Sequence, residues 1–212
     1  MLAQSEAGYR NLMKLTSKAY LETDSSETPQ VEIEVLEAHA GGLICLTGGP
    51  AGPVGRLLVD GQGPAAEAML VRLKAAFGNR IYMELMRHGL ENETRIEEAA
   101  IGLADKHGVP LVATNDAHYL GREDAEAHDV LLAIGTGKDL DDPTRFRFYG
   151  QESYVKSEAE MAELFPGHPE VLENTARVAE LCEFDFETRY FLPEFPLPRS
   201  EEHASELQSH VR

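Results

Sequence analysis

Basic residues are scarce in this chain of 212 residues. Lys and Arg together number 19 against 37 Asp and Glu, which gives a formal net charge of −18. A surface this acidic repels phosphate backbones and anionic lipid headgroups. The composition therefore excludes DNA binding through a broad positively charged surface of the chain itself.

Long apolar runs and cysteines are also lacking. No run approaches the roughly 20 apolar residues that a membrane-spanning helix needs, so we expect no contact with a membrane. The first residues have neither a basic start nor a hydrophobic segment, and we expect no signal peptide. The only cysteines, Cys45 and Cys182, stand in apolar stretches, which favours buried free thiols over a disulfide. These absences predict a globular, cytoplasmic protein.

Apolar stretches typical of buried strands alternate with stretches of helical periodicity, and 42% of the residues are hydrophobic, enough for an ordinary core. The expected strands are 43–47, 81–86 and 109–115. The expected helices are 9–20, 31–42, 53–61, 65–77, 91–108, 122–134, 157–165 and 169–184. This alternation predicts an α/β protein built from parallel β/α units.

Two of the expected helices carry residues suited to their N-terminal ends. Asn92 or Thr94 can cap the helix at 91–108, because both side chains accept hydrogen bonds from free backbone N–H groups. Ser157 and Glu160 have the spacing of a capping box at the start of the helix at 157–165.

Imidazole and carboxylate side chains follow two of the expected strands. His88 comes after the strand at 81–86, and Asp116 and His118 come after the strand at 109–115. Residues two apart on an extended segment point to the same side, about 6.6 Å apart. Imidazole with carboxylate is the ligand mixture of hydrolytic zinc and manganese sites. The competing interpretation is that Asp116 caps the following turn and His118 is solvated, because Asp-x-His alone is a weak pattern.

Three other residues are weighed for supporting roles at this site. Glu84 lies within an expected strand and can face inward as a buried acid near the metal. Asn115 can hold the strand exit through its side-chain amide, and His128 can orient a metal ligand from the next helix. For His128 a core or surface position on the helix is the competing interpretation.

Several segments, in this order, resemble the PHP domain (polymerase and histidinol phosphatase) of bacterial DNA polymerase III alpha subunits. The resemblance runs from about residue 2 to residue 198. It is carried by "GLICLTGGPAGPVGR", "YMELMRHGL", "GVPLVATNDAHYLGREDAEAHDVLLAIGTGKDLDDP", "YVKSEAEMAELFPGHPEVLENTARVAELCEF" and "YFLPEFPLP".

The resemblance implies a distorted (β/α)7 barrel with up to three divalent metal ions at its C-terminal mouth, zinc or manganese, while the parent polymerase uses magnesium. The family ligands that match this sequence are His88, Asp116 and His118. Some members of the family resemble metal-dependent 3′→5′ exonucleases. In others the cluster is degraded, and the domain holds the polymerase together and docks the separate proofreading exonuclease subunit. The implied partners are therefore other polymerase III holoenzyme subunits, with DNA bound through the parent protein.

The chain departs from the family at both ends. The family begins with a strand carrying His-x-His, and no His-x-His occurs in this sequence; nor are polymerase carboxylates present. We therefore expect a partial barrel lacking its first strands over 1–150, a helical end of the PHP region over 151–190, and a linker over 191–212. Such a barrel has an open edge and an uncovered apolar face, and its metal affinity is expected to be poor.

Three functional hypotheses follow from the resemblance. The first is a fragment of a polymerase III alpha subunit, a metal-binding PHP module inactive alone, whose parent performs DNA-directed DNA synthesis. The second is a free-standing PHP-type metal-dependent phosphoesterase. The third is a non-catalytic docking scaffold for a proofreading subunit.

Overall fold

The computed structural model of the chain describes residues 1–148, 150–186 and 190. Four strands form one sheet in the order β1-β2-β3-β4, with β1 antiparallel to β2 and the other neighbours parallel. The strands are β1 (Leu2–Ala3), β2 (Leu43–Leu46), β3 (Ile81–Leu85) and β4 (Leu111–Ala113). The mixed α/β class is thus confirmed, whereas the partial barrel stays a prediction, and the linker expected over 191–212 lies outside the described residues.

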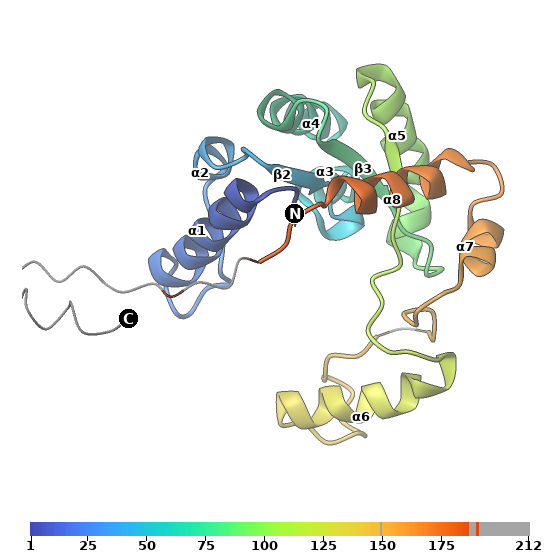
Figure 1. Cartoon of the computed structure of the whole chain (residues 1–212). Helices are drawn as coiled ribbons and strands as arrows, with labels where there is room; N and C mark the ends of the chain where they lie inside the picture. The colour runs from blue at the N-terminus through green and yellow to red at the C-terminus, as the bar shows by residue number, and fades with distance from the viewer. Residues whose placement is uncertain (149, 187–189, 191–212) are drawn as a thin grey trace, which may run out of the picture.

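Helices precede, connect and follow the strands (Figure 1). They are α1 (Glu6–Glu22), α2 (Ile33–Ala38), α3 (Pro53–Val59), α4 (Gly63–Phe77), α5 (Glu91–His107), α6 (Ala125–Thr136), α7 (Glu158–Leu164) and α8 (Glu170–Leu181), with 3-10 turns η1 (Gly49–Ala51) and η2 (Arg122–Asp124). Each predicted helix forms, most within a few residues of its expected bounds. Among the described residues, none of these helices has the length and apolarity to cross a membrane.

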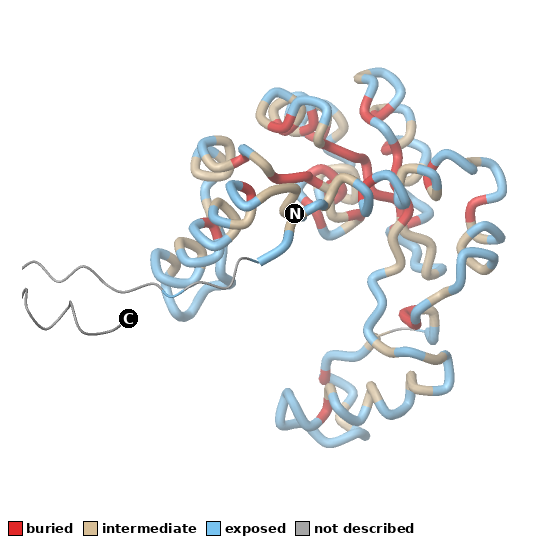
Figure 2. The backbone as a smooth tube through the Cα atoms, viewed as in Figure 1, coloured by how far each residue is buried: buried red, intermediate tan, exposed pale blue. Residues whose placement is uncertain are grey.

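One face of the sheet builds the main core. Alternate strand residues such as Leu43, Ile81 and Leu111 pack in one apolar cluster with Leu70 and Phe77 of α4. Leu43 and Leu70 are fully buried, and Figure 2 shows the buried segments gathered along the strands. Cys45 belongs to this cluster, and burial raises the pKa of its thiol to about 11. Both cysteines are free, as predicted, but only Cys45 is buried and Cys182 is half-buried.

The opposite face of the sheet is covered by α8. Ile44, Tyr82 and Val112 form a second buried cluster with Val178 of α8, and Leu181 packs against it. An uncovered apolar face was expected, whereas this second face of the sheet is packed by α8.

Helix α8 also lies along the outer edge of β4. The side-chain amide of Asn174 donates to the carbonyl of Leu111 at 2.8 Å, and the hydroxyl of Thr175 donates to the carbonyl of Ala113 at 3.0 Å. Strand edges present unpaired backbone groups that other strands can join. Because α8 satisfies these two carbonyls, the β4 edge is less open than predicted.

The turn after β2 depends on glycine. Gly48 has φ of 82°, a left-handed conformation that side chains rarely adopt. A Cβ atom on Gly52 would lie 1.7 Å from the carbonyl oxygen of Thr47. The glycines therefore let the chain turn tightly from β2 into α3, whose Val54 packs in the main core.

The segment between β4 and α7 extends away from the sheet as an arm, with α6 at its far end (Figure 1). Two stretches of chain form the base of the arm, and the backbone joins them. The N–H of His118 donates to the carbonyl of Ser153 at 2.8 Å, and the N–H of Val155 donates to the carbonyl of Tyr119 at 3.0 Å. We call residues 115–119 and 152–155 the neck of the arm.

Candidate metal centre

The ends of β3 and β4 meet at one edge of the sheet. Leu85 is paired with Ala113 in the parallel register, so the segments that follow both strands leave side by side. His88 follows β3, and Asp116 and His118 follow β4. The three predicted ligands therefore start from neighbouring strand ends, where α/β proteins commonly place their functional residues.

His88 is nearly enclosed, and both of its ring nitrogens have partners. Nδ1 lies 2.6 Å from a carboxylate oxygen of Glu93, and Nε2 lies 2.5 Å from the carbonyl oxygen of Asn115. A carbonyl oxygen can only accept, so Nε2 carries the proton in that bond. In this arrangement His88 has no free lone pair to offer a cation.

Hydrogen bonding and burial shift the pKa values of His88 and Glu93 in opposite directions. The hydrogen bond to Glu93 raises the pKa of His88 above its usual value, although burial of the ring acts in the opposite direction. Burial acts to raise the pKa of Glu93, but hydrogen bonds from His88 and Leu90 outweigh it and lower that pKa. Both shifts favour an imidazolium beside a carboxylate at neutral pH.

Glu93 also corrects the prediction for the start of α5. The helix begins after Leu90, whose backbone N–H donates to the Glu93 carboxylate at 3.1 Å, and neither Asn92 nor Thr94 is the N-cap residue. The same carboxylate accepts the backbone N–H of His88 at 2.7 Å. The sequence did contain a sign of this helix start. Glu93 stands at the third helical position, where an acidic side chain can accept hydrogen bonds from backbone N–H groups that precede the helix.

Asp116 and His118 lie close together on one of the two stretches of the neck, residues 115–119. Nε2 of His118 lies 3.4 Å from a carboxylate oxygen of Asp116, and both side chains are accessible, with 36% and 58% of their surfaces exposed. Asp116 has φ of 41°, a left-handed conformation that is uncommon outside glycine. Two of the three predicted ligands are thus presented together to solvent.

Aromatic rings hold the His118 side chain on the arm. Its centroid lies 4.5 Å from that of Phe148 and 5.4 Å from that of His128. His128 comes from α6, so it lies beside a predicted ligand, as the interpretation of His128 as an orienting residue requires. The structure records no hydrogen bond between the two imidazoles among the described residues.

The supporting residues are placed differently from one another. The amide of Asn115 donates to the carbonyls of Glu152 at 3.2 Å and Tyr154 at 2.6 Å, which is the predicted anchoring of the strand exit. Glu84 is buried, but it accepts from the N–H of Gly48 at 2.7 Å and the hydroxyl of Thr114 at 2.6 Å. Glu84 therefore ties three strand ends together.

The fit of these residues to a cation is partial. Within residues 1–148, 150–186 and 190, no three His, Cys, Asp or Glu side chains are grouped so that they could hold one metal ion. Asp116 and His118 are arranged as a pair of ligands, while His88 is turned toward Glu93 and Asn115. A site shared by His88, Asp116 and His118 therefore stays a prediction.

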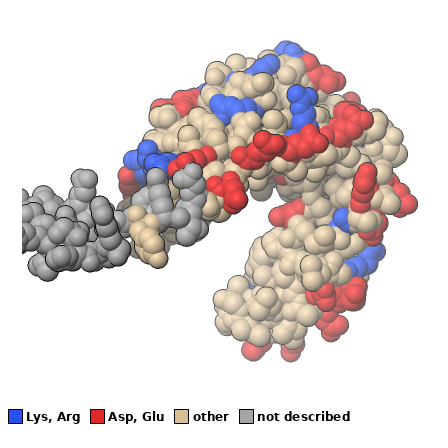
Figure 3. Space-filling model, in the orientation of Figure 1, with Lys and Arg blue, Asp and Glu red and all other residues tan. Residues whose placement is uncertain are grey.

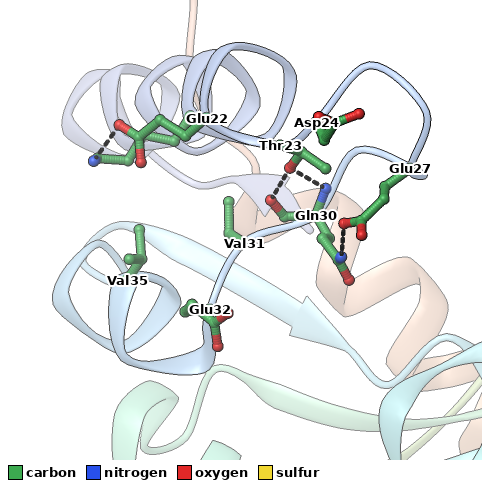
Figure 4. Close-up of a pocket in the computed structure, with 9 residues that line it drawn as sticks. Glu22, Thr23, Asp24, Glu27, Gln30, Val31, Glu32 and Val35 are labelled. Atoms are coloured by element: carbon green, nitrogen blue, oxygen red, sulfur yellow. Dashed lines mark hydrogen bonds and ion pairs between the residues drawn. The ribbon is translucent and has the colours of Figure 1, made fainter.

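A separate hollow of the surface lies between the end of α1 and the start of α2 (Figure 4). Acids line it, but the loop uses its polar groups internally. The Thr23 hydroxyl donates to the carbonyl of Gln30 at 3.0 Å, and Glu22 pairs with Lys18 at 2.8 Å. None of the predicted site residues lines this hollow.

Comparison with known proteins adds an independent line of observation. Residues 1–88 match the model of the PHP domain family. The DNA polymerase III subunit alpha of Treponema pallidum (strain Nichols) is 45% identical over 183 residues, covering 86% of this chain and 16% of that protein. The same subunit of Thermus aquaticus is 38% identical over 215 residues, covering 98% of this chain and 18% of that protein.

A third relative gives the same result: the DNA polymerase III subunit alpha of Escherichia coli (strain K12) is 39% identical over 197 residues, covering 92% of this chain and 17% of that protein. The chain thus spans only about a sixth of the length of these relatives. The matches extend over nearly all of the chain and agree on one kind of protein. Residues 1–88 thus match the PHP domain family, and nearly the whole chain is similar to bacterial DNA polymerase III alpha subunits.

Proposed function

We propose that this chain is a metal-binding PHP module of a replicative DNA polymerase III alpha subunit and works in the bacterial cytoplasm. The observation that carries the proposal is the 45% identity to an alpha subunit over 86% of the chain. DNA-directed DNA synthesis belongs to the parent protein, with magnesium as its metal. The module's partners are other subunits of the polymerase III holoenzyme, among them a proofreading exonuclease subunit, and its acidic surface leaves DNA contact to other parts.

The proposed metal is a divalent ion, zinc or manganese, at the exits of β3 and β4. Asp116 and His118 supply the two ligands that already face each other. His88 joins them only if its ring gives up the bond to the Asn115 carbonyl and its Nε2 loses the proton. Because this exchange opposes binding, the affinity of the chain alone is expected to be low.

Calorimetric titration of the chain with Zn²⁺ or Mn²⁺ tests the metal site. We expect one weak binding event that Asp116→Ala removes. The matched control is Asp105→Ala, which deletes an exposed carboxylate on α5 away from the strand ends and is expected to leave the binding isotherm unchanged. Equal loss of metal binding in both variants, or binding that survives Asp116→Ala, would contradict the proposal that Asp116 is a metal ligand.

The chain alone is expected to have no nuclease activity, because the predicted ligands do not form a shared three-residue site. The measurement is release of label from a 3′-labelled oligonucleotide with Zn²⁺ or Mn²⁺ present. Cleavage above the buffer level that disappears in His118→Ala would show that the prediction is wrong.

A non-catalytic scaffold is the second candidate function, and the hydrogen bonding of His88 favours it. With Nδ1 on Glu93 and Nε2 on Asn115, the side chain fastens the exit of β3 to α5 and to the end of β4. This is a structural use of a histidine. Complete absence of Zn²⁺ and Mn²⁺ binding in the calorimetric experiment would support the scaffold over the metal module.

A further inference from the structure

Asp116 has an uncommon backbone conformation at the candidate metal centre. Within the part of the chain that the structure describes, it is the only residue other than glycine with a positive φ, at 41°. Such a conformation is unfavourable for a residue with a side chain, and it persists where the surrounding structure imposes it. The same residue presents its carboxylate 3.4 Å from Nε2 of His118. The groups that impose the conformation therefore also decide where this carboxylate lies.

The peptide bond that precedes Asp116 is held from two sides. The carbonyl of Asn115 accepts a hydrogen bond from Nε2 of His88 at 2.5 Å, and the Asn115 amide donates to the carbonyls of Glu152 and Tyr154. This carbonyl belongs to the planar peptide unit that Asn115 shares with Asp116. The bond from His88 therefore fixes the orientation of that plane, and φ of Asp116 is measured from it.

The chain that follows Asp116 is held as well. The N–H of His118 donates to the carbonyl of Ser153 at 2.8 Å, on the other stretch of the neck. Asp116 thus lies between two fastened points, and its φ and ψ must satisfy both of them. Figure 3 shows that the arm beyond the neck stands apart from the body of the sheet, so these contacts at its base set the direction in which residues 116–118 leave.

His88 is itself held by a buried carboxylate. Nδ1 of His88 lies 2.6 Å from Glu93, which also accepts the backbone N–H of His88 at 2.7 Å. The two side chains are 8% and 5% exposed, so water has little access to these bonds. Glu93 stands in the first turn of α5, and Ala100 of the same helix packs in the main core. His88 therefore connects a helix anchored in the core to the end of β4.

We propose that His88 is a positioning residue of the metal centre and not one of its ligands. Its Nε2–H holds the Asn115 carbonyl, which keeps Asp116 in the left-handed conformation with its carboxylate beside His118. Both ring nitrogens of His88 are used in this role, in agreement with the lack of a three-residue metal group among the described residues. The inference rests on the metal site of the proposed function, and it gives His88 a different role from the ligand role that the resemblance implies.

Calorimetric titration with Zn²⁺ separates the two roles, because two substitutions at position 88 each keep one of the two ring bonds. A Gln side chain places its amide N–H near the position of Nε2 of a histidine, and an Asn side chain places it near Nδ1. His88→Ala should raise the Kd for Zn²⁺ about tenfold or more. His88→Gln should recover most of the lost affinity, because it can still donate to the Asn115 carbonyl. His88→Asn should not recover it.

A ligand role predicts a different result for the same variants. Zinc takes Cys, His and carboxylate side chains, and a neutral amide is a poor substitute for an imidazole. All three substitutions would then weaken binding equally. If His88→Ala does not fold, the comparison of His88→Gln with His88→Asn still separates the roles, and thermal melting followed by circular dichroism checks each variant.

His107 provides the matched control. Its Nε2 lies 2.8 Å from the carboxylate of Glu67, so this histidine also joins α5 to a neighbouring element, but at the opposite end of α5 from Glu93. His107→Ala should leave the Kd for Zn²⁺ unchanged. An equal rise of the Kd in His88→Ala and His107→Ala would overturn the proposal, because it would assign the loss to general destabilisation.

Two NMR measurements follow the positioning step directly. In the metal-free chain, cross-relaxation between the β protons of Asp116 and the ring protons of His118 should be present in the unaltered chain and in His88→Gln, and should be weak in His88→Ala. When Zn²⁺ is added, the ring nitrogens of His88 should keep both protons, which their ¹⁵N shifts report.

The outcomes distinguish this inference from the proposed function. His88→Gln binding Zn²⁺ as weakly as His88→Ala, or loss of the Nε2 proton of His88 on addition of Zn²⁺, would overturn the positioning role while the metal site stands. No binding to the unaltered chain would contradict the metal site itself. The metal-free cross-relaxation then decides whether His88 positions Asp116, and an unchanged signal in His88→Ala would reject that role.

Discussion

The sheet and the arm are held together by different interactions. Where the sheet meets α4, Leu43 of β2 and Leu70 and Phe77 of α4 are at most 1% exposed and pack in one apolar cluster. At the base of the arm the contacts are polar, chiefly backbone hydrogen bonds and the amide of Asn115. Burial of apolar surface scales with area, whereas each hydrogen bond gives a small net gain. The sheet therefore carries most of the stability, and the arm depends on a few directional contacts.

Phe77→Ala should give the largest effect and would test this division. The side chain is 1% exposed in the main core, so its removal is expected to lower the free energy of unfolding by about 3–5 kcal/mol. Leu131→Ala on the exposed face of α6 should change it by no more than about 0.5 kcal/mol. Urea denaturation at a concentration where the chain is monomeric measures both. Similar losses of unfolding free energy in the two variants would contradict the proposal that the sheet carries most of the stability.

Asn115→Ala should give an intermediate effect that is confined to the arm. The amide makes two hydrogen bonds to carbonyls of the neck, and their loss is expected to cost about 1–3 kcal/mol of local stability. Hydrogen exchange should become faster in residues 115–155 and stay unchanged in β2 and β3. Asn92→Ala, at an exposed residue of α5, is the control. Faster exchange throughout the sheet would contradict the separation of the two regions.

Acid should loosen the polar contacts beside the neck before it affects the apolar core. Hydrogen bonds from Ser157, and another from the hydroxyl of Tyr154, lower the pKa of Glu160 to about 2. Because the pKa is lowered in the folded state, the stabilisation is complete above the ordinary value of 4.5 and is lost as the pH falls toward 2.

NMR titration of the Glu160 carboxyl group measures this smallest effect. Ser157→Ala should raise the pKa of Glu160, because it removes the hydroxyl that donates to the carboxylate at 2.7 Å. The matched control is Ser25→Ala, in the loop that follows α1. An unchanged Glu160 titration in Ser157→Ala would show that the capping box does not set the pKa.

Local sequence was sufficient for most of the elements and for one helix cap, although β1 (Leu2–Ala3) was not predicted. The strands at β2, β3 and β4 and the helices between them follow the periodicity of apolar residues, which is a property of neighbouring positions. Ser157 caps α7 and Glu160 completes the capping box, as predicted, since both residues lie within one helical turn. The start of α5 was assigned wrongly because Glu93 reaches back to Leu90 in place of a capping side chain at Asn92 or Thr94.

The candidate site depended on contacts between distant parts of the chain. Sequence placed His88, Asp116 and His118 at the ends of neighbouring strands, and the parallel register of β3 and β4 brings those ends together. It did not predict that the ring of His88 bonds to the carbonyl of Asn115, which belongs to a different strand exit. Hydrogen-bond partners of this kind are set by packing, so they cannot be obtained from the spacing of residues.

The sequence by itself determined the acidic surface, the alternation of strands and helices, and the chemistry available at the strand ends. Only the tertiary structure decided that α8 covers the second face of the sheet and the β4 edge, that His88 is used internally, and that α6 presents an apolar stripe to solvent. The physical reason is the sequence separation over which each property is set. Apolar periodicity depends on neighbouring residues, and net charge is a sum over the chain. Burial and hydrogen-bond pairing depend on which distant segments of the chain come into contact.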